Sequence, residues 1–567
     1  MTHQPYLWTE HYPPSIEWAL DLVPKPVFSM LQDTAERFPD RPAFDFLGKK
    51  YNWGTIYNQA QRLAKGLQDL GIGKGDNVGV FLPNSPYFLV SYYGILMSGA
   101  TVVNLNPLYA EGELAHLVED SEIKTVISLD LKMLHDKMLK MLGETGLERI
   151  IVCRFTDILP FPKNMLFPIV KRAEIAQIEI NKRIMHFKDV IDNDGAVVIP
   201  EIDPENDLAV LQYTGGTTGR PKGAMLTHKN VYANAVQSKL WLPNVKVGED
   251  KMLGVLPFFH VFAMTVVMNF SVLNALEIIA LPRFDLKDTL KTIHKKKPQF
   301  LPAVPAIYNA INTSPLRDKY DLSSIEACIS GGAPLPVEVK RKFEEKTGCV
   351  VVEGYGLTES SPVACGNPIE GENKAGAIGL PVPGTIIEII NPEDKVTPMP
   401  LGERGELCIR GPQVMKGYWK KPDATNETLR LTEDGDYRLY TGDVAIMDED
   451  GYFFIVDRIK DMIITNGYNV YPRNVEEAIY KHPSVEECIV AGLPDKNRGE
   501  IVKVWIKLRQ GRELSIEDLK AFLKDKISPM EIPKRYEFRE EPLPKTMIGK
   551  LSRKDVIAQE ADDKKDA

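Results

Sequence analysis

The amino-acid sequence alternates short apolar, β-branched runs with helical patterns over most of its length, and this alternation limits the fold more than any other feature. Residues 77–82, 101–105, 125–129 and 149–153 are predicted to be buried strands, and residues 91–98 are predicted to be a helix. A strand–helix–strand order is typical of mainly parallel sheets covered by helices. We therefore expect an α/β protein.

The pattern changes from about residue 385 onwards. Residues 386–390, 405–410 and 452–456 are short strand-like runs separated by Gly, Pro and Asp, which predicts a small β-rich unit. A further unit, with both helical and strand patterns, begins near Arg458. The last residues, 558–567, are charged and poor in apolar side chains, so we expect a disordered tail there.

Composition excludes several classes of protein. A chain of 567 residues is too long for one core, since domains usually hold about 100–200 residues. The net charge of −9 gives no overall attraction to nucleic acid. The six cysteines include no CxxC pair, which favours free thiols over zinc or disulfides. The sequence shows neither a signal-peptide pattern nor an apolar run of about 18 residues, so we expect a cytoplasmic protein.

One segment, residues 169–191, combines apolar residues at helical spacing with Lys and Arg on other faces. This pattern predicts a basic amphipathic helix. Such a helix can lie on an anionic membrane surface, or it can pack its apolar stripe on the domain beneath. The sequence leaves both interpretations open.

A glycine- and threonine-rich stretch, YTGGTTGRPKG at residues 213–223, follows a strand-like run at residues 208–212. Glycines allow backbone N–H groups to turn towards an anion, and Lys222 adds a positive charge suited to phosphate. A Walker A loop, GxxxxGK[ST], fits nowhere in this stretch. The residues predict a phosphate-binding loop, with a Gly/Thr surface turn as the alternative.

A second stretch, VVEGYGLTE at residues 351–359, begins like a GxGxxG motif but has Glu359 at the sixth position. A dinucleotide fingerprint therefore fails where its last glycine should stand. Tyr355 could stack on a nucleobase and Glu359 could ligate a hard cation such as Mg²⁺. A plain strand–turn cap is the alternative.

Two shorter stretches contain further candidates. Asp443, in YTGD, could accept hydrogen bonds from both hydroxyls of a ribose. DRIKD at residues 457–461 would ordinarily be a solvated charged turn. Lys550, in PKTMIGK, has a spacing that by itself gives no reason to single it out.

Taken together, these stretches resemble the adenylate-forming enzymes, a family that includes acyl-CoA synthetases, luciferase-type enzymes and peptide-synthetase adenylation domains. YTGGTTGRPKG, GYGLTE, YTGD, DRIKD and PKTMIGK occur in the family's order, and the resemblance spans roughly residues 28–555. Bacterial long-chain fatty acyl-CoA ligases look most similar. The stretches that support this are GAMLTHKN, PFFHVFAM, GLPVPGT, GPQVMKGYW and NGYNVYP.

The resemblance implies an α/β fold with a large N-terminal domain, residues 1–457, and a small mobile α+β C-terminal domain, residues 458–557. The large domain would consist of two mainly parallel helix-covered sheets plus a small β-rich subdomain. It would hold the acyl and ATP sites, and the small domain would carry the catalytic lysine, Lys550.

The implied activity is that of an AMP-forming acid–thiol ligase. ATP and a fatty acid would give acyl-AMP and pyrophosphate, with Mg²⁺ present, and CoA would then take the acyl group. The ATP-binding residues implied by the resemblance are Thr214, Gly215, Gly216, Thr217, Thr218, Gly219, Lys222, Gly332, Ala333, Pro334, Glu353, Gly354, Tyr355, Gly356, Thr358, Asp443 and Arg458.

The resemblance assigns the other roles as well. Thr214, Glu359 and Lys550 would be catalytic, with Thr214 and Glu359 also contacting Mg²⁺. Lys460 and Gly467 would line the CoA tunnel, and Asp457 would be the hinge between the domains. The acyl pocket would be bordered by His260, Phe262, Met264 and Val304.

In some relatives a Trp after the histidine closes the entrance to this pocket, and Phe262 and Met264 occupy that region here. His260 itself could be only a core histidine. The remaining alternatives are an aryl or medium-chain acyl-CoA ligase, an acyl-AMP ligase without CoA activity, and a nucleotide sensor without turnover. We also expect peripheral contact with the inner face of the membrane through residues 169–191. A homodimer is a further expectation.

Overall fold

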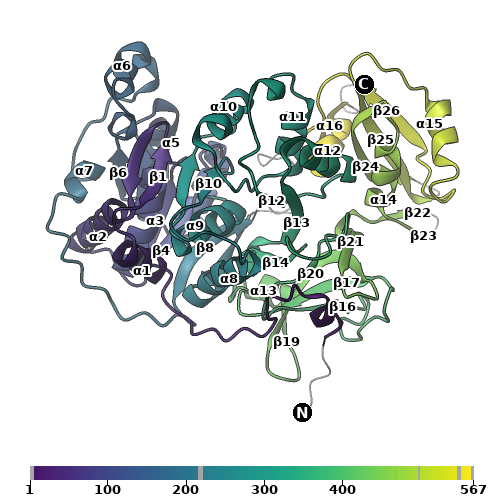
Figure 1. Ribbon diagram of the computed structural model, residues 1–567, viewed down its shortest axis with the longest axis horizontal. Helices are drawn as coiled ribbons and strands as arrows, with labels where there is room; N and C mark the ends of the chain where they lie inside the picture. Colours follow the sequence, from purple (N-terminus) through teal and green to yellow (C-terminus); the bar gives the residue numbers. More distant parts are fainter. Residues whose placement is uncertain (1–5, 215–220, 466–467, 496–497, 546–550, 564–567) are drawn as a thin grey trace. The chain divides into compact units, whose positions relative to one another are not determined.

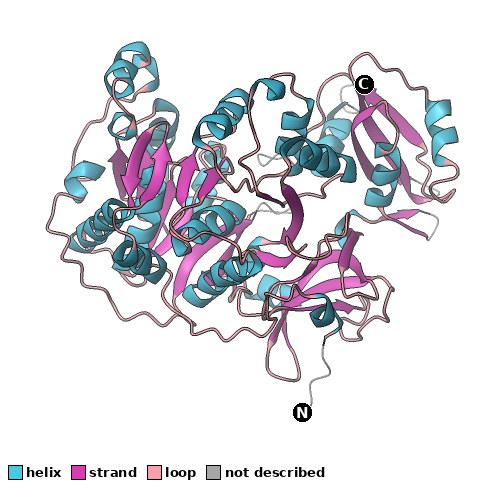
Figure 2. Cartoon of the chain, viewed as in Figure 1, coloured by secondary structure: helices cyan, strands magenta, loops and turns pink. Residues whose placement is uncertain are grey.

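The computed structural model describes residues 6–214, 221–465, 468–495, 498–545 and 551–563 (Figure 1). Its contacts divide the chain into two compact units. The larger unit comprises His11–Ile386 and Arg410–Leu439, and the smaller comprises Met1–Glu10, Ile387–Ile409 and Tyr440–Ala567. Both units combine helices and strands, so the predicted α/β class is confirmed (Figure 2).

The first sheet of the larger unit has eight strands in the order β18-β9-β8-β4-β3-β5-β6-β7. The six strands from β8 to β7 are parallel, whereas β9 and β18 are antiparallel to their neighbours. In chain order the strands are β3 (Asn77–Phe81), β4 (Thr101–Asn104), β5 (Thr125–Leu129), β6 (Arg149–Cys153), β7 (Ile184–His186), β8 (Leu208–Thr214), β9 (Lys222–Thr227) and β18 (Gly417–Tyr418).

The second sheet is built from two four-stranded parts, β10-β11-β1-β2 and β12-β13-β14-β15. Phe300 bridges β10 to β12 through parallel pairing with Met252 and Ala327, and the two parts therefore continue each other. The strands are β1 (Pro42–Phe46), β2 (Lys49–Asn52), β10 (Lys251–Gly254), β11 (Glu277–Ala280), β12 (Ala327–Ser330), β13 (Val350–Gly356), β14 (Val363–Gly366) and β15 (Leu380–Pro381).

Helices flank these sheets, and α3 (Pro86–Ser98) lies in the core with almost every residue buried. Ser85 caps its N-terminus, Pro86 suits the first turn, and Gly99 ends it with a φ of 89°. The other helices of this unit are α1 (Ser29–Arg37), α2 (Trp53–Asp69), α4 (Glu111–Asp120), α5 (Lys132–Glu144), α6 (Lys163–Val170), α7 (Phe187–Val190), α8 (His228–Trp241), α9 (Phe270–Leu273), α10 (Leu286–Lys296), α11 (Pro305–Thr313), α12 (Val337–Thr347) and α13 (Pro422–Thr428).

A five-stranded sheet has the order β16-β17-β20-β19, with β21 paired to β20, and all of its strands except β19 (Leu429–Leu431) lie mostly in the smaller unit. A second sheet follows with the order β23-β22-β25-β24, and β26 pairs in parallel with β25. The elements are β16 (Ile386–Ile390), β17 (Gly405–Arg410), β20 (Tyr437–Met447), β21 (Phe453–Arg458), β22 (Ile463–Thr465), β23 (Tyr468–Val470), α14 (Pro472–Tyr480), β24 (Val485–Asp495), β25 (Gly499–Leu508), α15 (Ile516–Leu523), β26 (Arg535–Arg539) and α16 (Arg553–Asp563).

The helix predicted over residues 169–191 is wrong. The structure has the end of α6, a short 3₁₀ turn, an extended stretch, β7 and α7 in its place. Ile184 is buried because β7 pairs with β6, and the Asn181 side chain accepts from the N–H groups of Arg183 and Ile184 just before that strand. Sheet pairing thus overrides the helical spacing. No described helix has the length and apolar character needed to cross a bilayer.

The C-terminal tail also differs from the prediction. α16 continues to Asp563, so much of the segment predicted as disordered, residues 558–567, is helical. Val556 is fully buried in α16, and Glu560 forms an ion pair with the buried Lys503, which anchors the helix on β25. Residues 564–567 lie outside the described residues.

Candidate active site

The glycine- and threonine-rich stretch connects two antiparallel strands. β8 and β9 pair so that Thr214 lies opposite Lys222, and the Thr214 hydroxyl donates to the Lys222 carbonyl oxygen at 3.4 Å. The sheet therefore holds both ends of the stretch side by side, unlike the strand-to-helix arrangement of a Walker A loop. Five predicted phosphate-binding residues lie outside the described residues: Gly215, Gly216, Thr217, Thr218 and Gly219.

Lys222, Tyr418 and Glu359 form a line of contacts beside these strands. The Lys222 ammonium lies 4.6 Å from the centre of the Tyr418 ring, and the Tyr418 hydroxyl donates to Glu359 Oε1 at 2.6 Å. Burial, followed by the charge of Glu359, raises the pKa of Tyr418. Tyr418 therefore stays protonated. Its ring contacts the Lys222 ammonium and its hydroxyl donates to the Glu359 carboxylate, so it links the two charged residues.

Glu359 lies in the 3₁₀ turn Thr358–Ser360, which packs against β8 and β9. The fold thus brings Glu359 to the strands that carry Thr214 and Lys222. The described residues contain no group of three or more His, Cys, Asp or Glu placed to hold a metal by themselves. One carboxylate and one hydroxyl nevertheless fit Mg²⁺, which proteins often bind with one or two side chains together with substrate phosphates.

The ends of β12 and β13 bring the next set of predicted residues together. These strands are parallel, with Ser330 opposite Glu353, so the residues beyond them lie side by side. Glu353 is buried, and its carboxylate accepts from the Leu335 N–H at 3.1 Å, which fixes the turn after β12. The residues gathered here are Gly332, Ala333, Pro334, Gly354, Tyr355, Gly356 and, one turn on, Thr358.

Glycines are required at this edge of the sheet because the backbone approaches closely. A Cβ on Gly356 would lie 1.9 Å from the Pro362 carbonyl oxygen, where β13 pairs with β14. A Cβ on Gly331 would lie 3.0 Å from the Phe262 ring. Phe262 therefore borders the residues that follow β12, and the predicted acyl and nucleotide residues meet at this point.

His260 precedes a π-helix, Ala263–Asn269, and its Nδ1 accepts from the Phe262 N–H at 3.3 Å. Met264 is fully buried and its sulfur accepts from the Asn104 amide at 3.5 Å. Val304 is buried just before α11, next to Ala303, which pairs with Ser330 of β12. Met264 and Val304 are thus core residues in this conformation.

Asp443 in the smaller unit lies within strand β20. It pairs with Arg458 on β21, and Arg458 Nε donates to Asp443 Oδ1 at 3.1 Å. Gly442 has a φ of 73°, and its N–H donates to the buried carboxylate of Glu406 at 2.9 Å. The Thr441 hydroxyl accepts from the Asp443 N–H at 3.1 Å.

Asp457, the predicted hinge, is buried at the end of β21. Its carboxylate accepts from the N–H groups of Arg458 at 2.8 Å and Arg473 at 2.7 Å, and burial raises its pKa, partly offset by the charge of Arg553. Lys460, the predicted CoA residue, is exposed. Gly467 and Lys550 lie outside the described residues.

Arg553, three residues after Lys550, joins several parts of the smaller unit. Its guanidinium donates to Glu476 at 2.7 Å, to Asp461 at 2.9 Å and to the Val490 carbonyl oxygen at 3.0 Å. Burial raises the pKa of Glu476, and the cation of Arg553 opposes this rise. Burial acts against the charged form of Arg553, but its three acidic neighbours prevail and raise its pKa.

Sequence reasoning missed Tyr418, Glu406 and Arg553 as parts of the site or its support. Tyr418 stands in GPQVMKGYW and Arg553 follows shortly after PKTMIGK, so their nearness to these motifs could have indicated that they belong to the site. Their partners are distant in the sequence, however, and no pattern points to them. Glu406 had no such signal.

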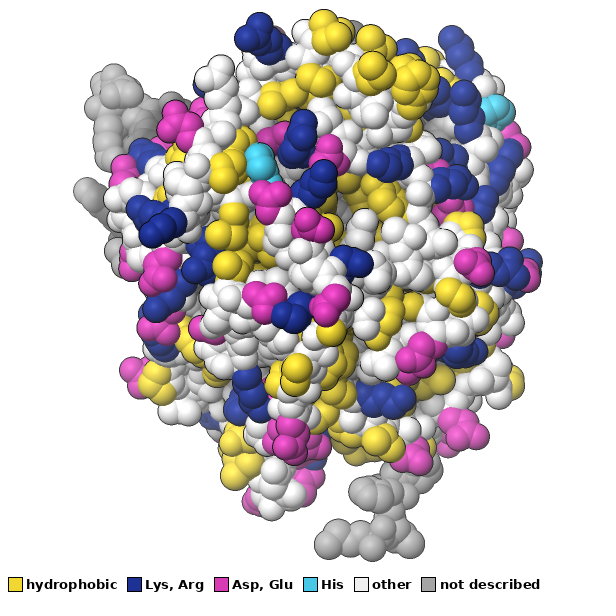
Figure 3. All heavy atoms as spheres, turned by 90° about the vertical axis from the view of Figure 1, so that its left-hand side faces the viewer, with side chains coloured by type: hydrophobic (Ala, Val, Ile, Leu, Met, Phe, Trp, Pro, Cys, Tyr) yellow, Lys and Arg dark blue, Asp and Glu magenta, His cyan; other side chains and the backbone are white. Residues whose placement is uncertain are grey.

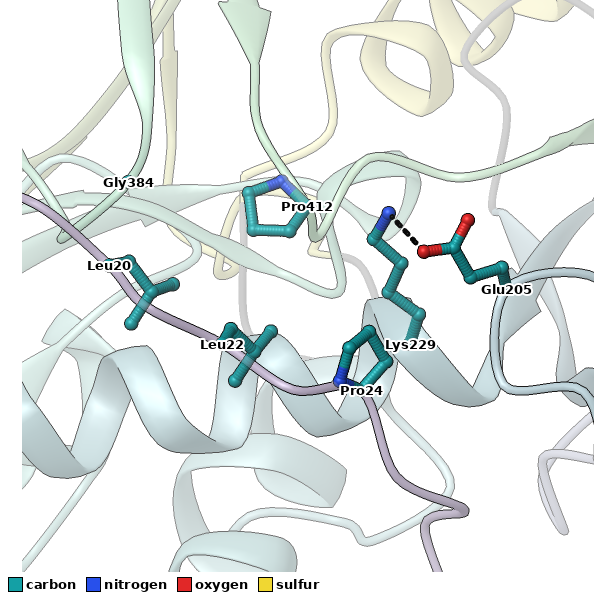
Figure 4. A pocket seen from close by; sticks show the side chains of 7 residues that line it. All are labelled: Leu20, Leu22, Pro24, Glu205, Lys229, Gly384 and Pro412. Atoms are coloured by element: carbon teal, nitrogen blue, oxygen red, sulfur yellow. Dashed lines mark hydrogen bonds and ion pairs between the residues drawn. The ribbon is translucent and has the colours of Figure 1, made fainter.

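A pocket elsewhere in the larger unit contains none of the predicted site residues (Figure 4). The extended N-terminal segment that carries Leu20, Leu22 and Pro24 lines one side of it. An ion pair between Lys229 and Glu205, 3.2 Å long, lies on the other side.

Comparison with known proteins gives matches over nearly the whole chain. The AMP-binding enzyme family model matches residues 31–419, and the model of the AMP-binding enzyme C-terminal domain matches residues 474–550. A long-chain-fatty-acid–CoA ligase of Bacillus subtilis is 47% identical over 559 residues, which cover 98% of each chain.

More distant relatives agree with these matches. A long-chain-fatty-acid–CoA ligase of Escherichia coli O157:H7 is 35% identical, with 97% of each chain covered. Among solved structures, ATP-bound MatB from Rhodopseudomonas palustris superposes with a TM-score of 0.82 at 27% identity, covering 95% of this chain and 99% of MatB.

Proposed function

Since the chain belongs to the AMP-binding enzyme family, we propose that it is a long-chain fatty acid–CoA ligase. ATP and the fatty acid give acyl-AMP and pyrophosphate, and CoA then displaces AMP to give the acyl-CoA. The observation that carries this proposal is the 47% identity to a ligase of that name along the full length of both chains. The joined contacts of Lys222, Tyr418 and Glu359 beside the glycine-rich stretch support it.

The ATP phosphates are bound at the end of β8. Lys222 supplies the positive charge and residues 214–219 supply hydroxyl and backbone donors. Thr214 and Glu359 would hold Mg²⁺ together with the phosphates. The metal, when bound, offsets the charge that develops on the departing pyrophosphate. Tyr418 donates a hydrogen bond to Glu359 Oε1 and would thereby fix the orientation of the carboxylate.

The nucleoside lies along the ends of β12 and β13 in this proposal. Gly332, Ala333 and Pro334 form one wall of the adenine slot, and Tyr355 stacks on the base from the other. Glu353 supports the slot through its bond to the Leu335 N–H, and Thr358 borders it. Asp443 accepts from the ribose hydroxyls, with Arg458 beside it.

Lys550 has the central role in the chemistry of the first step. The carboxylate of the acid and the α-phosphate are both anionic, and attack on phosphorus builds up further charge. A positioned ammonium stabilises that transition state, and its removal costs about 100–1000-fold in rate. Lys550→Ala should therefore slow acyl-AMP formation by about 100–1000-fold while ATP binding persists.

The second step needs no protein nucleophile because the acyl-AMP is already activated. Residues 458–557 rotate about Asp457, so that Lys550 withdraws and Lys460 and Gly467 line the entry path of CoA. The acyl chain lies near His260, Phe262, Met264 and Val304, and the fully buried Met264 and the buried Val304 then have to shift when it enters.

The hinge role of Asp457 has a direct test. Asp457→Pro fixes φ and should prevent the rotation, whereas the matched control Asp457→Ala leaves φ free. We expect the Pro variant to retain ATP–pyrophosphate exchange and to lose acyl-CoA formation, with both reactions retained by the Ala variant. Equal loss of the two reactions in the Pro variant would contradict the hinge assignment.

The substrate class is tested by measuring acyl-CoA formation from octanoate, palmitate, oleate and benzoate at equal concentrations. A long-chain ligase prefers palmitate or oleate. A preference for octanoate or benzoate makes it a medium-chain or aryl ligase, and pyrophosphate exchange without thioester product makes it an acyl-AMP ligase. Complete inactivity with every acid would overturn the assignment as an enzyme.

The cytoplasm, with peripheral contact to the inner face of the membrane, is the proposed place of action, because long-chain acids partition into bilayers. The homodimer stays a prediction, which light scattering on the purified protein measures directly.

A further inference from the structure

Helix α6, Lys163–Val170, is composed mostly of apolar residues, yet none of its eight residues, all of them described, is buried. Together with flanking residues it forms a segment, residues 161–172, that we name the α6 tip. Its large apolar side chains are among the most exposed in the chain: Phe161 78%, Met165 62%, Leu166 51%, Ile169 75% and Val170 73%. Soluble surfaces rarely gather so many in one short stretch.

Contacts with neighbouring elements hold the α6 tip in place. The Phe167 ring packs on Phe155, with ring centres 4.9 Å apart, and Lys163 donates to the Leu47 carbonyl oxygen at 3.4 Å. After the tip, the Ala176 N–H donates to the Asp130 carbonyl oxygen at 2.8 Å. These contacts use one aromatic side chain for anchoring and leave the remaining apolar side chains facing outwards.

Positive charge surrounds this apolar surface. Residues 161–174 contain Lys163, Lys171 and Arg172 against one acid, Glu174, which pairs with Lys171 at 2.5 Å. The local charge of +2 (three cations minus one anion) contrasts with −9 for the whole chain. Figure 3 views the molecule from the side on which α6 lies, and shows apolar side chains at the upper end of that face with Lys and Arg side chains around them.

We propose that the α6 tip is a membrane-docking surface that inserts its apolar side chains among the headgroups of an anionic phospholipid bilayer. Apolar side chains with lysine and arginine at both ends of the helix match such a surface. The apolar side chains suit the boundary of the acyl chains, and the cations suit the anionic headgroups. A protein partner would not need cations on both sides of an apolar helix. The purpose of this docking rests on the proposed function, because a bilayer is where a long-chain acid is found.

The docking surface coincides only in part with the segment that the sequence predicted. Residues 169–191 share only residues 169–172 with the α6 tip, and Ile184 and Phe187, which belong to the predicted apolar stripe, are buried in the structure. The proposed contact with lipid therefore begins N-terminal to the predicted segment and overlaps only its first residues, 169–172, and its sequence contains two prolines, Pro162 and Pro168.

Co-sedimentation of the full-length protein with phospholipid vesicles tests the proposal. The variants are Ile169→Asp with Val170→Asp, which puts charge on the apolar surface, and Lys171→Gln with Arg172→Gln, which removes cations. The matched control is Val337→Asp, at the first residue of α12, where an apolar side chain is 55% exposed. Vesicles of phosphatidylglycerol and of phosphatidylcholine separate the charge requirement from the apolar one.

We expect the native chain to bind phosphatidylglycerol vesicles, the apolar double variant to bind at least tenfold more weakly, and the Lys171/Arg172 variant to lose its preference for the anionic lipid. The Val337 variant should bind normally, and all variants should keep the circular dichroism of the native chain. Absence of vesicle binding by the native chain, or equal binding by the apolar double variant, would overturn the proposal.

Two further readouts distinguish membrane docking from self-association and from a role in catalysis. A fall from dimer to monomer in light scattering of the Ile169/Val170 variant would assign the tip to self-association and also overturn the proposal. Formation of octanoyl-CoA from soluble octanoate should not change in this variant. If the native chain makes no acyl-CoA at all, the proposed function fails, whereas vesicle binding still decides the role of the tip.

Discussion

At the scale of single residues, the site depends on side chains that connect motifs rather than on the motifs alone. Tyr418 contributes its ring face to Lys222 and its hydroxyl to Glu359. A hydrogen bond to a charged group contributes about 1.5–3 kcal/mol. The loss of this bond should affect the step that needs an oriented Glu359 carboxylate more than it affects binding of the nucleotide.

Substitution Tyr418→Phe tests this division because it removes the hydroxyl and keeps the ring. We expect pyrophosphate exchange to slow about tenfold or more and to need more Mg²⁺, with little change in the KM for ATP. Tyr418→Ala removes the ring contact of Lys222 as well and should raise that KM. Tyr437→Phe, at a tyrosine that is 57% exposed, is the control and should behave as the native chain. Equal effects of Tyr418→Phe on KM and Mg²⁺ demand would contradict the assignment.

The sequence identifies Glu359 and Lys222 because each stands in a motif with a recognisable backbone requirement. It cannot identify Tyr418, since a two-residue strand, β18, brings this residue to β9 from a distant part of the chain. Met264, predicted to border the acyl chain, is fully buried in this structure, where its sulfur accepts a hydrogen bond from the Asn104 amide. Apolar residues near a site look alike in sequence whether they line a pocket or fill the interior.

At the scale of elements, strand ends determine where the site forms. The parallel register of β12 and β13 sets the glycines of two separate motifs side by side, and the antiparallel pairing of β8 and β9 closes the phosphate-binding stretch. Sequence patterns located these strands because buried strands are apolar and β-branched. They failed over residues 169–191, since the pairing of β7 with β6 is a long-range contact that local spacing does not encode.

Gly356 offers a test of the close approach between β13 and β14. In Gly356→Ala the new Cβ would meet the Pro362 carbonyl oxygen at 1.9 Å, and a backbone atom cannot simply rotate away. We expect a loss of about 1–3 kcal/mol in the free energy of unfolding, together with weaker ATP binding. Gly112→Ala, in α4 with open space around it, should be neutral or slightly stabilising. Thermal denaturation of both variants decides between these expectations.

The ion cluster around Arg553 gives a second prediction for an element, α16. In Arg553→Met the carboxylate of Glu476, whose side chain is only 16% exposed, loses its cation, which should cost about 3–5 kcal/mol. Combining it with Glu476→Gln removes the uncompensated charge and should restore part of that loss. Chemical denaturation of the single and double variants measures the difference. A double variant no more stable than Arg553→Met would show that the pair is not the source of the effect.

At the scale of the whole molecule, buried ionisable groups make stability depend on pH. His228 is buried at the start of α8, and its Nδ1 accepts from the Val27 N–H at 3.0 Å. Burial lowers its pKa from 6.5 to about 4. Between these values the unfolded chain binds a proton that the folded chain does not, so protonation favours unfolding as the pH falls.

We therefore expect the contribution of His228 to the free energy of unfolding of the larger unit to be complete above pH 6.5. Towards pH 4 this free energy should fall progressively, by a few kcal/mol at most. In His228→Gln the pH dependence over this window should be shallower, because glutamine can accept from Val27 without titrating. Urea denaturation between pH 4 and pH 7 provides the comparison. Parallel curves for the native chain and the variant would show that another group is responsible.

The strand order of the eight-stranded sheet also governs how the chain reaches its folded state. β8 pairs in parallel with β4, with Val210 beside Val102, although the strands β5, β6 and β7 all lie between them in sequence. Pairings between such distant segments form slowly, and until β8 arrives β4 is an open edge that can recruit other chains. The predicted phosphate-binding stretch begins where β8 ends, so nucleotide binding during refolding should appear late and should coincide with the disappearance of aggregation-prone intermediates.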